Sequence, residues 1–134
     1  MQVRHLDHVV ITVRDVQKVV DFYKILGMRH EHFVSTEGDE RHAMHFGPHK
    51  INIHVEGKEF QPHAHQPIPG AGDFCFLSDE PVDAWMAHLQ AHHVDVFLGP
   101  VPRNGASGAI RSIYMRDPEG NLIEIANPDN GSPN

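Results

Sequence analysis

The chain has 134 residues, of which 40% are hydrophobic, and a formal net charge of −7. This is enough for one compact domain with a sizeable core, while the negative charge argues against binding to nucleic acid or to an anionic membrane surface. The single cysteine, Cys75, excludes an internal disulfide and fits a reducing compartment. Because no signal peptide and no membrane-spanning stretch are predicted, we expect a cytoplasmic protein.

The first half of the chain is predicted to have the order β-α-β-β-β. Val3–Val13 is rich in β-branched residues, which favours a strand. Asp15 is suited to cap a helix whose apolar residues follow helical spacing, and Gly27 is suited to end it. The three strands predicted after this helix are Met28–Ser35, Arg41–Phe46 and Ile51–Val55.

The second half repeats the order of the first. It follows a Pro- and Gly-rich linker, and its helix is predicted to begin near Pro81. The strands predicted here are Asp73–Leu77, Val94–Leu98, Ile110–Met115 and Leu122–Ala126, with a Gly/Pro loop at Gly99–Gly108. We expect a single domain with module 1 at about residues 3–56, a linker at about 57–71, module 2 at about 72–127 and a disordered tail at 128–134. A repeat of this kind relates equivalent positions by a pseudo-twofold axis.

The thirteen histidines favour metal binding without locating a site, and the repeat indicates where a site can lie. Pro48 precedes His54 by the same interval as Pro118 precedes Glu124, so these two residues are predicted to be equivalent. The first strands are aligned with His8 opposite Asp73.

Two imidazoles with one or two carboxylates suit a divalent ion of Fe, Zn, Mn, Ni or Co better than Ca²⁺. The sequence therefore predicts a metal held by His8, His54 and Glu124. Asp73 is a fourth candidate, which could instead cap a turn or orient His8 from outside the ligand set.

Several short motifs are spread over essentially the whole chain. They are Leu6–Val10, Asp21–Tyr23 with Leu26–Gly27, Lys50–His54, Gly105-Ala106 with Ser112–Tyr114, and Arg116–Glu124. In these motifs the chain resembles the vicinal oxygen chelate superfamily, which includes glyoxalase I, extradiol dioxygenases and bleomycin and fosfomycin resistance proteins. Within it, the resemblance is nearest to small glyoxalase-domain proteins known as virulence proteins.

The resemblance implies an α+β fold in which two tandem βαβββ modules form a cupped mixed sheet around a divalent metal. It also implies a homodimer and a substrate that binds the metal through two oxygens, and it places His8, His54 and Glu124 on ligand positions. Two departures separate the chain from glyoxalase I: His54 stands where a carboxylate is usual, and Asp73 stands where histidine is commoner.

The function predicted first is a metal-dependent, glyoxalase-like lyase or isomerase that acts on a small oxygen-chelating metabolite, with Glu124 as a proton carrier. Arg103, Ser112 and Tyr114 are candidate substrate-binding residues, although a solvated turn and ordinary strand packing explain them nearly as well. Two alternatives stay open: an Fe(II) extradiol-type dioxygenase, since two histidines and a carboxylate suit that chemistry, and a metal-free protein that binds a drug or metabolite.

Overall fold

The computed structural model describes residues 1–129. Its elements follow the order β-α-β-β-β twice, which confirms the predicted α+β class and the tandem βαβββ modules. Among the described residues, no helix has the length and apolar character needed to cross a membrane. The described residues form two compact units, with unit 1 formed by residues 1–72 and 118–120 and unit 2 by 73–117 and 121–129.

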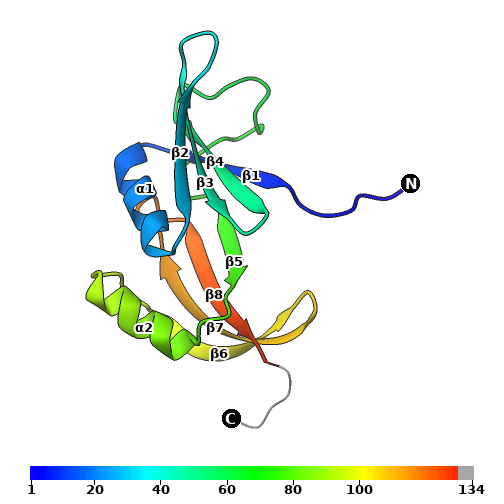
Figure 1. The fold of residues 1–134 in the computed structure, drawn as a ribbon, viewed down its shortest axis with the longest axis vertical. Coiled ribbons are helices and arrows are strands. Elements are labelled where there is room, and N and C mark those ends of the chain that lie inside the picture. Colours follow the sequence, from blue (N-terminus) through cyan, green and yellow to red (C-terminus); the bar gives the residue numbers. More distant parts are fainter. Residues whose placement is uncertain (130–134) are drawn as a thin grey trace. The chain divides into compact units, whose positions relative to one another are not determined.

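Unit 1 contains one four-stranded mixed sheet and one helix (Figure 1). The sheet order is β1-β4-β3-β2, with β1 parallel to β4 and the other pairs antiparallel. The elements are β1 (His8–Val13), α1 (Val16–Ile25), β2 (Arg29–Val34), β3 (Glu40–Phe46) and β4 (His49–Val55).

Two carboxylates fix the start of α1. The Asp15 side chain accepts a hydrogen bond from the backbone N–H of Lys18, as an N-cap residue does. The two carboxylate oxygens of Glu119 accept from the backbone N–H groups of Arg14 and Asp15, at 2.9 and 3.0 Å. Four amide groups precede the regular helix bonds, so these contacts satisfy donors that would otherwise lack partners.

Unit 2 has the same topology, with the sheet order β5-β8-β7-β6 and β5 parallel to β8 (Figure 1). The elements are β5 (Asp73–Leu77), α2 (Val82–Ala91), β6 (Leu98–Gly105), β7 (Gly108–Arg116) and β8 (Leu122–Pro128). In both sheets the buried residues alternate along the strands, so one face of each sheet belongs to the core.

The prediction of a loop over Gly99–Gly108 was wrong, because β6 occupies most of that range. Pro100 and Pro102 are tolerated because β6 is the edge strand, where a missing N–H breaks no ladder on its open side. The register shifts between Leu98 and Val101. Gly99 is needed at this irregularity, since its φ is +111° and an added Cβ would lie 2.5 Å from the backbone oxygen of Ser112.

Three other predicted boundaries move. The first strand begins at His8 rather than at Val3, and Val94 to Phe97 precede β6 instead of forming a strand. Strand β8 continues to Pro128, and the backbone N–H of Asp129 donates to the oxygen of Ala109 at 2.8 Å. The disordered tail predicted for 128–134 therefore begins too early, and its residues 130–134 lie outside the described part of the chain.

The start of α2 depends on a side chain from β8. Pro81 is the N-cap residue and makes no side-chain capping bond. Instead, the amide oxygen of Asn127 accepts from the N–H of Val82 at 2.8 Å, and its nitrogen donates to the oxygens of Ser78 and Glu80 at 2.9 and 2.7 Å. One amide therefore replaces the missing N-cap and ties α2 to β5 and β8.

We expect Asn127→Ala to lower the free energy of unfolding by about 2 to 4 kcal/mol, because it removes three hydrogen bonds and leaves their partners unsatisfied. Urea denaturation followed by circular dichroism measures this change. Gln90→Ala, an exposed position on α2, is the matched control and should change stability by less than about 0.5 kcal/mol. Equal stabilities of the two variants would contradict this role of Asn127.

Candidate active site

The candidate residues divide between the two units. His8 and His54 belong to unit 1. The other candidates, Asp73, Arg103, Ser112, Tyr114 and Glu124, belong to unit 2. Each group is described within its own unit.

The sheet of unit 2 places three reactive side chains in one row. In the register, Glu124 of β8 lies between Cys75 of β5 and Tyr114 of β7. Residues directly opposite each other in neighbouring strands project from the same face of a sheet. A thiol, a carboxylate and a phenol therefore stand side by side on the face opposite the buried Ile123 and Ile125.

Ser112 holds the carboxylate of Glu124 in place. Its side-chain hydroxyl belongs to a fully buried residue and donates to Glu124 Oε2 at 2.5 Å. A carboxylate on an apolar strand needs donors or a cation to offset the loss of water, and this bond supplies one donor. Cys75 and Tyr114 also form side-chain hydrogen bonds with this carboxylate, so its neighbours in the row hold it as well.

A cavity of about 580 Å³ opens on this side of the sheet. Its lining includes Cys75, Glu124 and Tyr114 from the row, together with Leu77 and Arg103. A volume of this order suits a small metabolite. The structure thus brings Arg103, Tyr114 and Glu124 to one cavity, and Ser112 lies outside its lining but hydrogen-bonds Glu124.

Arg103 and Tyr114 contact each other at the wall of the cavity. Arg103 Nε donates to the phenolic oxygen of Tyr114 at 2.9 Å, and Nη1 donates to the backbone oxygen of Pro102 at 3.0 Å. Partial burial raises the pKa of Tyr114, the bond from Arg103 opposes that change, and the charge of Glu124 adds to it. Tyr114 is therefore a neutral hydrogen-bonding group at neutral pH.

Asp73 is the first residue of β5 and lies opposite Leu122. It is exposed, and strand alternation puts it on the same face as Cys75. Its charge contributes to raising the pKa of the Cys75 thiol. Asp73 therefore lies near the row of Glu124, at the same face of the sheet.

In unit 1, His8 is the first residue of β1 and is largely exposed. Its Nδ1 contacts Asp7 Oδ2 at 2.8 Å, and this bond lowers the pKa of the Asp7 carboxyl. A carboxylate that accepts from Nδ1–H leaves Nε2 with a free lone pair, which is the form that binds a metal.

His54 is half-buried on β4, with its ring edge-on to Phe60 at a centroid distance of 5.3 Å. Its Nδ1 is buried and has no hydrogen-bond partner among the described residues. Burial lowers the pKa of His54, so the ring is neutral at pH 7. An orphaned imidazole nitrogen of this kind fits a ligand, since buried polar atoms normally have partners.

The predicted equivalence of His54 and Glu124 is wrong by two residues. The registers are His8 opposite Lys50 in unit 1 and Asp73 opposite Leu122 in unit 2. If His8 and Asp73 are equivalent, the residue equivalent to Glu124 is therefore Asn52. Burial agrees, because Asn52 lies between buried Ile51 and Ile53 as Glu124 lies between buried isoleucines.

The error arises from the turns that precede the last strands. Two residues join β3 to β4, whereas five join β7 to β8, so counting from the prolines misaligns the strands. The repeat therefore no longer supports His54 as a metal ligand, and its buried, unpaired Nδ1 is the remaining evidence for that role. His8 and His54 also lie four residues apart along paired strands, or roughly 13 Å.

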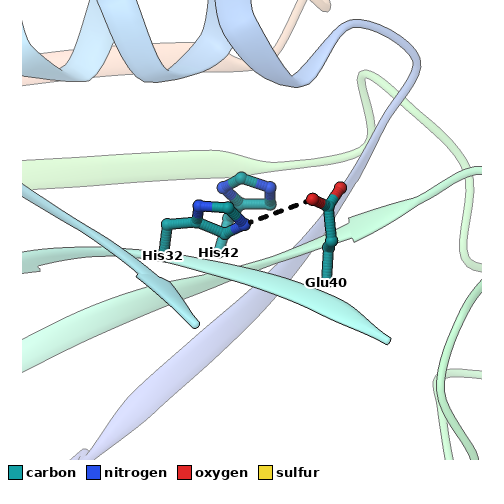
Figure 2. Close-up of side chains that lie close together, drawn as sticks. All are labelled: His32, Glu40 and His42. Atoms are coloured by element: carbon teal, nitrogen blue, oxygen red, sulfur yellow. Dashed lines mark ion pairs between the residues drawn. The ribbon is translucent and has the colours of Figure 1, made fainter. Parts of the chain in front are cut away.

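Sequence reasoning missed two features. Cys75 lies beside Glu124, which strand alternation alone does not reveal because β5 and β8 are distant in the sequence. A second donor cluster, His32, Glu40 and His42, lies on β2 and β3, with possible ligand atoms within 4.8 Å of one another (Figure 2). The spacing of His30 and His32, and of Glu40 and His42, was a signal for it.

The row in unit 2 predicts an unreactive thiol. The Cys75 side chain is exposed at the cavity, but loss of water around its sulfur and then the charge of Glu124 raise its pKa to about 11. Because the thiolate is the nucleophile, alkylation by iodoacetamide at pH 8 should be about a hundredfold slower than that of an unhindered thiol. Glu124→Gln should speed the reaction and Glu80→Gln, an exposed control, should not. A wild-type rate equal to that of a free thiol would contradict this arrangement.

Three comparisons place the chain among known proteins. It is 48% identical over 126 residues to the glyoxalase domain-containing protein RDO1 of Mycosarcoma maydis, covering 94% of this chain and 69% of that protein. It is 40% identical over 127 residues to the virulence protein STM3117 of Salmonella typhimurium, covering 94% and 85%. The crystal structure of STM3117 superposes with a TM-score of 0.88 over 96% of this chain and 100% of that one.

A structure from the mobile metagenome of V. Pseudocholerae, VPC_CASS1, superposes with a TM-score of 0.90 at 44% identity, covering 97% of this chain and 98% of that one. Residues 5–125 match the Glyoxalase/Bleomycin resistance protein/Dioxygenase superfamily. The match spans both βαβββ modules and the row that contains Glu124. The chain therefore belongs to the Glyoxalase/Bleomycin resistance protein/Dioxygenase superfamily.

Proposed function

We propose that this protein is a metal-dependent, glyoxalase-like enzyme of the lyase or isomerase type. Its substrate is a small anionic metabolite with neighbouring oxygens, bound in the cavity of unit 2. The observation that carries this proposal is the convergence of Glu124, Tyr114 and Arg103 on one cavity, with Glu124 oriented by a buried hydroxyl.

The residues present fit a divalent ion of the Fe, Zn, Mn, Ni or Co type. Glu124 offers a carboxylate that is already oriented by Ser112, His54 an orphaned ring nitrogen, and His8 a ring whose other nitrogen contacts Asp7. Asp73 is a further carboxylate on the face of Glu124. His8 and His54 lie roughly 13 Å apart along paired strands, so one ion takes only one of them from a given chain. His8, His54, Glu124 and Asp73 remain the candidate ligands, and a bound ion would act as a Lewis acid on the substrate oxygens.

Glu124 is proposed to move the proton. Removal of a proton next to a carbonyl group requires a base that is held in place and within reach of the substrate. The Ser112 hydroxyl orients the carboxylate, which takes the proton and returns it to a neighbouring carbon or oxygen. The neutral Tyr114 can hydrogen-bond the substrate without adding negative charge beside this base.

Arg103 is proposed to bind the anionic part of the substrate. Its Nε and Nη1 are engaged by Tyr114 and Pro102, which fixes the plane of the guanidinium group. The remaining N–H groups of Nη2 are then available to a carboxylate or phosphate.

We expect Glu124→Gln to abolish proton exchange. The assay incubates the protein, loaded with each metal in turn, with α-hydroxyketones in D₂O and follows deuterium incorporation by NMR. The variant should be at least about a hundredfold slower, since a general base contributes that much or more. Ser112→Ala should be slower by a smaller factor, because it frees the base without removing it. Glu80→Gln is the exposed control and should match the wild type.

Measurements of oxygen uptake and metal content on the same metal-loaded protein test the other functions predicted from the sequence. Oxygen uptake on catechols by the iron-loaded protein would replace the proposal by a dioxygenase. Ligand binding by a reconstituted protein in which Glu124→Gln removes less than about 0.2 metal per chain would replace it by a metal-free binding protein. Equal exchange rates for the wild type and Glu124→Gln would also overturn it.

Arg103→Lys should separate binding from chemistry. A lysine keeps the charge but cannot be held by Tyr114 and Pro102 while it still offers N–H groups to the substrate, so we expect KM to rise about tenfold with kcat nearly unchanged. Steady-state kinetics on any substrate found in the screen measures both. An equal fall in kcat with KM unchanged would place Arg103 in the chemical step instead.

A further inference from the structure

One face of the β2–β3 hairpin carries an imidazole stack beside a carboxylate (Figure 2). His32 and His42 lie directly opposite each other in the register, with ring centroids 4.5 Å apart and planes within 2°. His30 stacks on His42 at 5.2 Å. Glu40 lies two residues before His42, on the same face, and its Oε1 is 3.6 Å from His32 Nε2.

The hydrogen bond between His30 and His42 prepares one ring for binding. His30 Nε2 and His42 Nδ1 are 2.9 Å apart, so one of them carries the proton and the other accepts it. If His42 Nδ1–H donates, its Nε2 keeps a free lone pair. A metal-binding histidine commonly donates its second N–H in this way, which fixes the tautomer and orients the ring.

We propose that His32, Glu40 and His42 form a second binding site, for a divalent transition metal that favours imidazole, such as Zn²⁺, Co²⁺, Ni²⁺ or Cu²⁺. None of these residues is in the ligand set proposed for the enzyme, so this site does not rest on the proposed function. His30 is a positioning residue, because it acts through His42. Ca²⁺ and Mg²⁺ are excluded since they require oxygen ligands.

The distances suit such an ion after a small movement of the side chains. The three candidate ligand atoms lie within 4.8 Å of one another, and tetrahedral Zn²⁺ with bonds of about 2.0 to 2.1 Å needs them roughly 3.3 Å apart. The backbones of β2 and β3 are fixed by their ladder, so only the side-chain torsions must change. A water molecule would complete the four-coordinate set.

Access to the site is open. The side chains of His32 and Glu40 are 45% and 70% exposed, whereas His42 is half-buried. An ion can therefore enter from solvent and lose only part of its water, while the half-buried ring supplies the fixed ligand. A stack that served packing alone would bury its members against apolar side chains and would not hold a carboxylate at its open edge.

Zinc binding to the full chain, prepared without a His-tag, tests the proposal. Equilibrium dialysis with Zn²⁺ alone should show one equivalent fewer for the double variant His32→Gln/His42→Gln than for the wild type. The matched control His65→Gln, an exposed histidine in the linker, should bind as the wild type does. When loaded with Co²⁺, the double variant should lack the visible absorption of the ion bound at the hairpin, while the wild type and His65→Gln should both show it.

Two further variants keep the test sharp. Glu40→Gln changes an exposed side chain and should weaken this binding step at least about tenfold without altering the fold, as judged by circular dichroism. His30→Gln should weaken it by a similar factor, as loss of an orienting partner does. Equal Zn²⁺ stoichiometry in the wild type and a folded double variant, or unchanged affinity in Glu40→Gln, would overturn the site.

Glu124→Gln separates this site from the proposed enzymatic one. This variant should still bind the Zn²⁺ equivalent that depends on His32 and His42, while it loses proton exchange. If Glu124→Gln lost the Zn²⁺ equivalent that binds to the β2–β3 hairpin, the two sites would not be independent. If His32→Gln/His42→Gln lost proton exchange, the enzymatic metal would instead be the one bound at the hairpin.

Discussion

The parallel pairing of the first and last strands of each module is the constraint on which the candidate sites depend. A parallel pair needs a long crossover, and here it contains a helix and an antiparallel hairpin. The register then decides which side chains share a row. In unit 2 a shift of one residue would turn Glu124 into the core and expose Ile123. The burial of the isoleucines that stabilises the sheet is therefore also what directs the carboxylate into the cavity.

The two modules share a backbone pattern but carry different donors on it. At the position equivalent to Glu124, unit 1 has Asn52, a neutral amide that binds transition metals weakly. Unit 1 instead supplies imidazoles, His8 and His54, while unit 2 supplies the carboxylates. This division concentrates negative charge beside Ser112, and the buried Ser112 hydroxyl donates its hydrogen bond to Glu124. The two modules therefore share their backbone topology, and they differ in the side chains that could bind a metal or move a proton.

The tandem βαβββ order was predictable because hydrophobic periodicity, the cap at Asp15 and the stop at Gly27 are local signals. The ends of strands were not, because they depend on a partner: the first strand begins at His8, where β4 can pair with it. Composition also misled at β6, where an edge position accepts prolines that a central strand would reject.

The candidate site was predictable to a similar degree. Glu124 was found because a carboxylate on an apolar strand is costly and so calls for an explanation. Its neighbours Ser112 and Cys75 are defined by pairing across strands, and a turn of different length misplaced the equivalent of Glu124 in the first half. Register between distant strands is the information that a single sequence holds least directly.

Two separate groups of histidines are candidate metal donors, and this changes what a metal analysis means. Alternation along two paired strands gathers His30, His32 and His42 on one partly exposed face, where the sheet has already fixed the backbone. Such a site competes for the same ions as any site built on Glu124, because both follow the same order of affinity among divalent metals. Total metal per chain therefore measures the sum of two donor sets. Only occupancy that disappears with Glu124 bears on the chemistry of the cavity, and only occupancy that disappears with His32 and His42 bears on the hairpin.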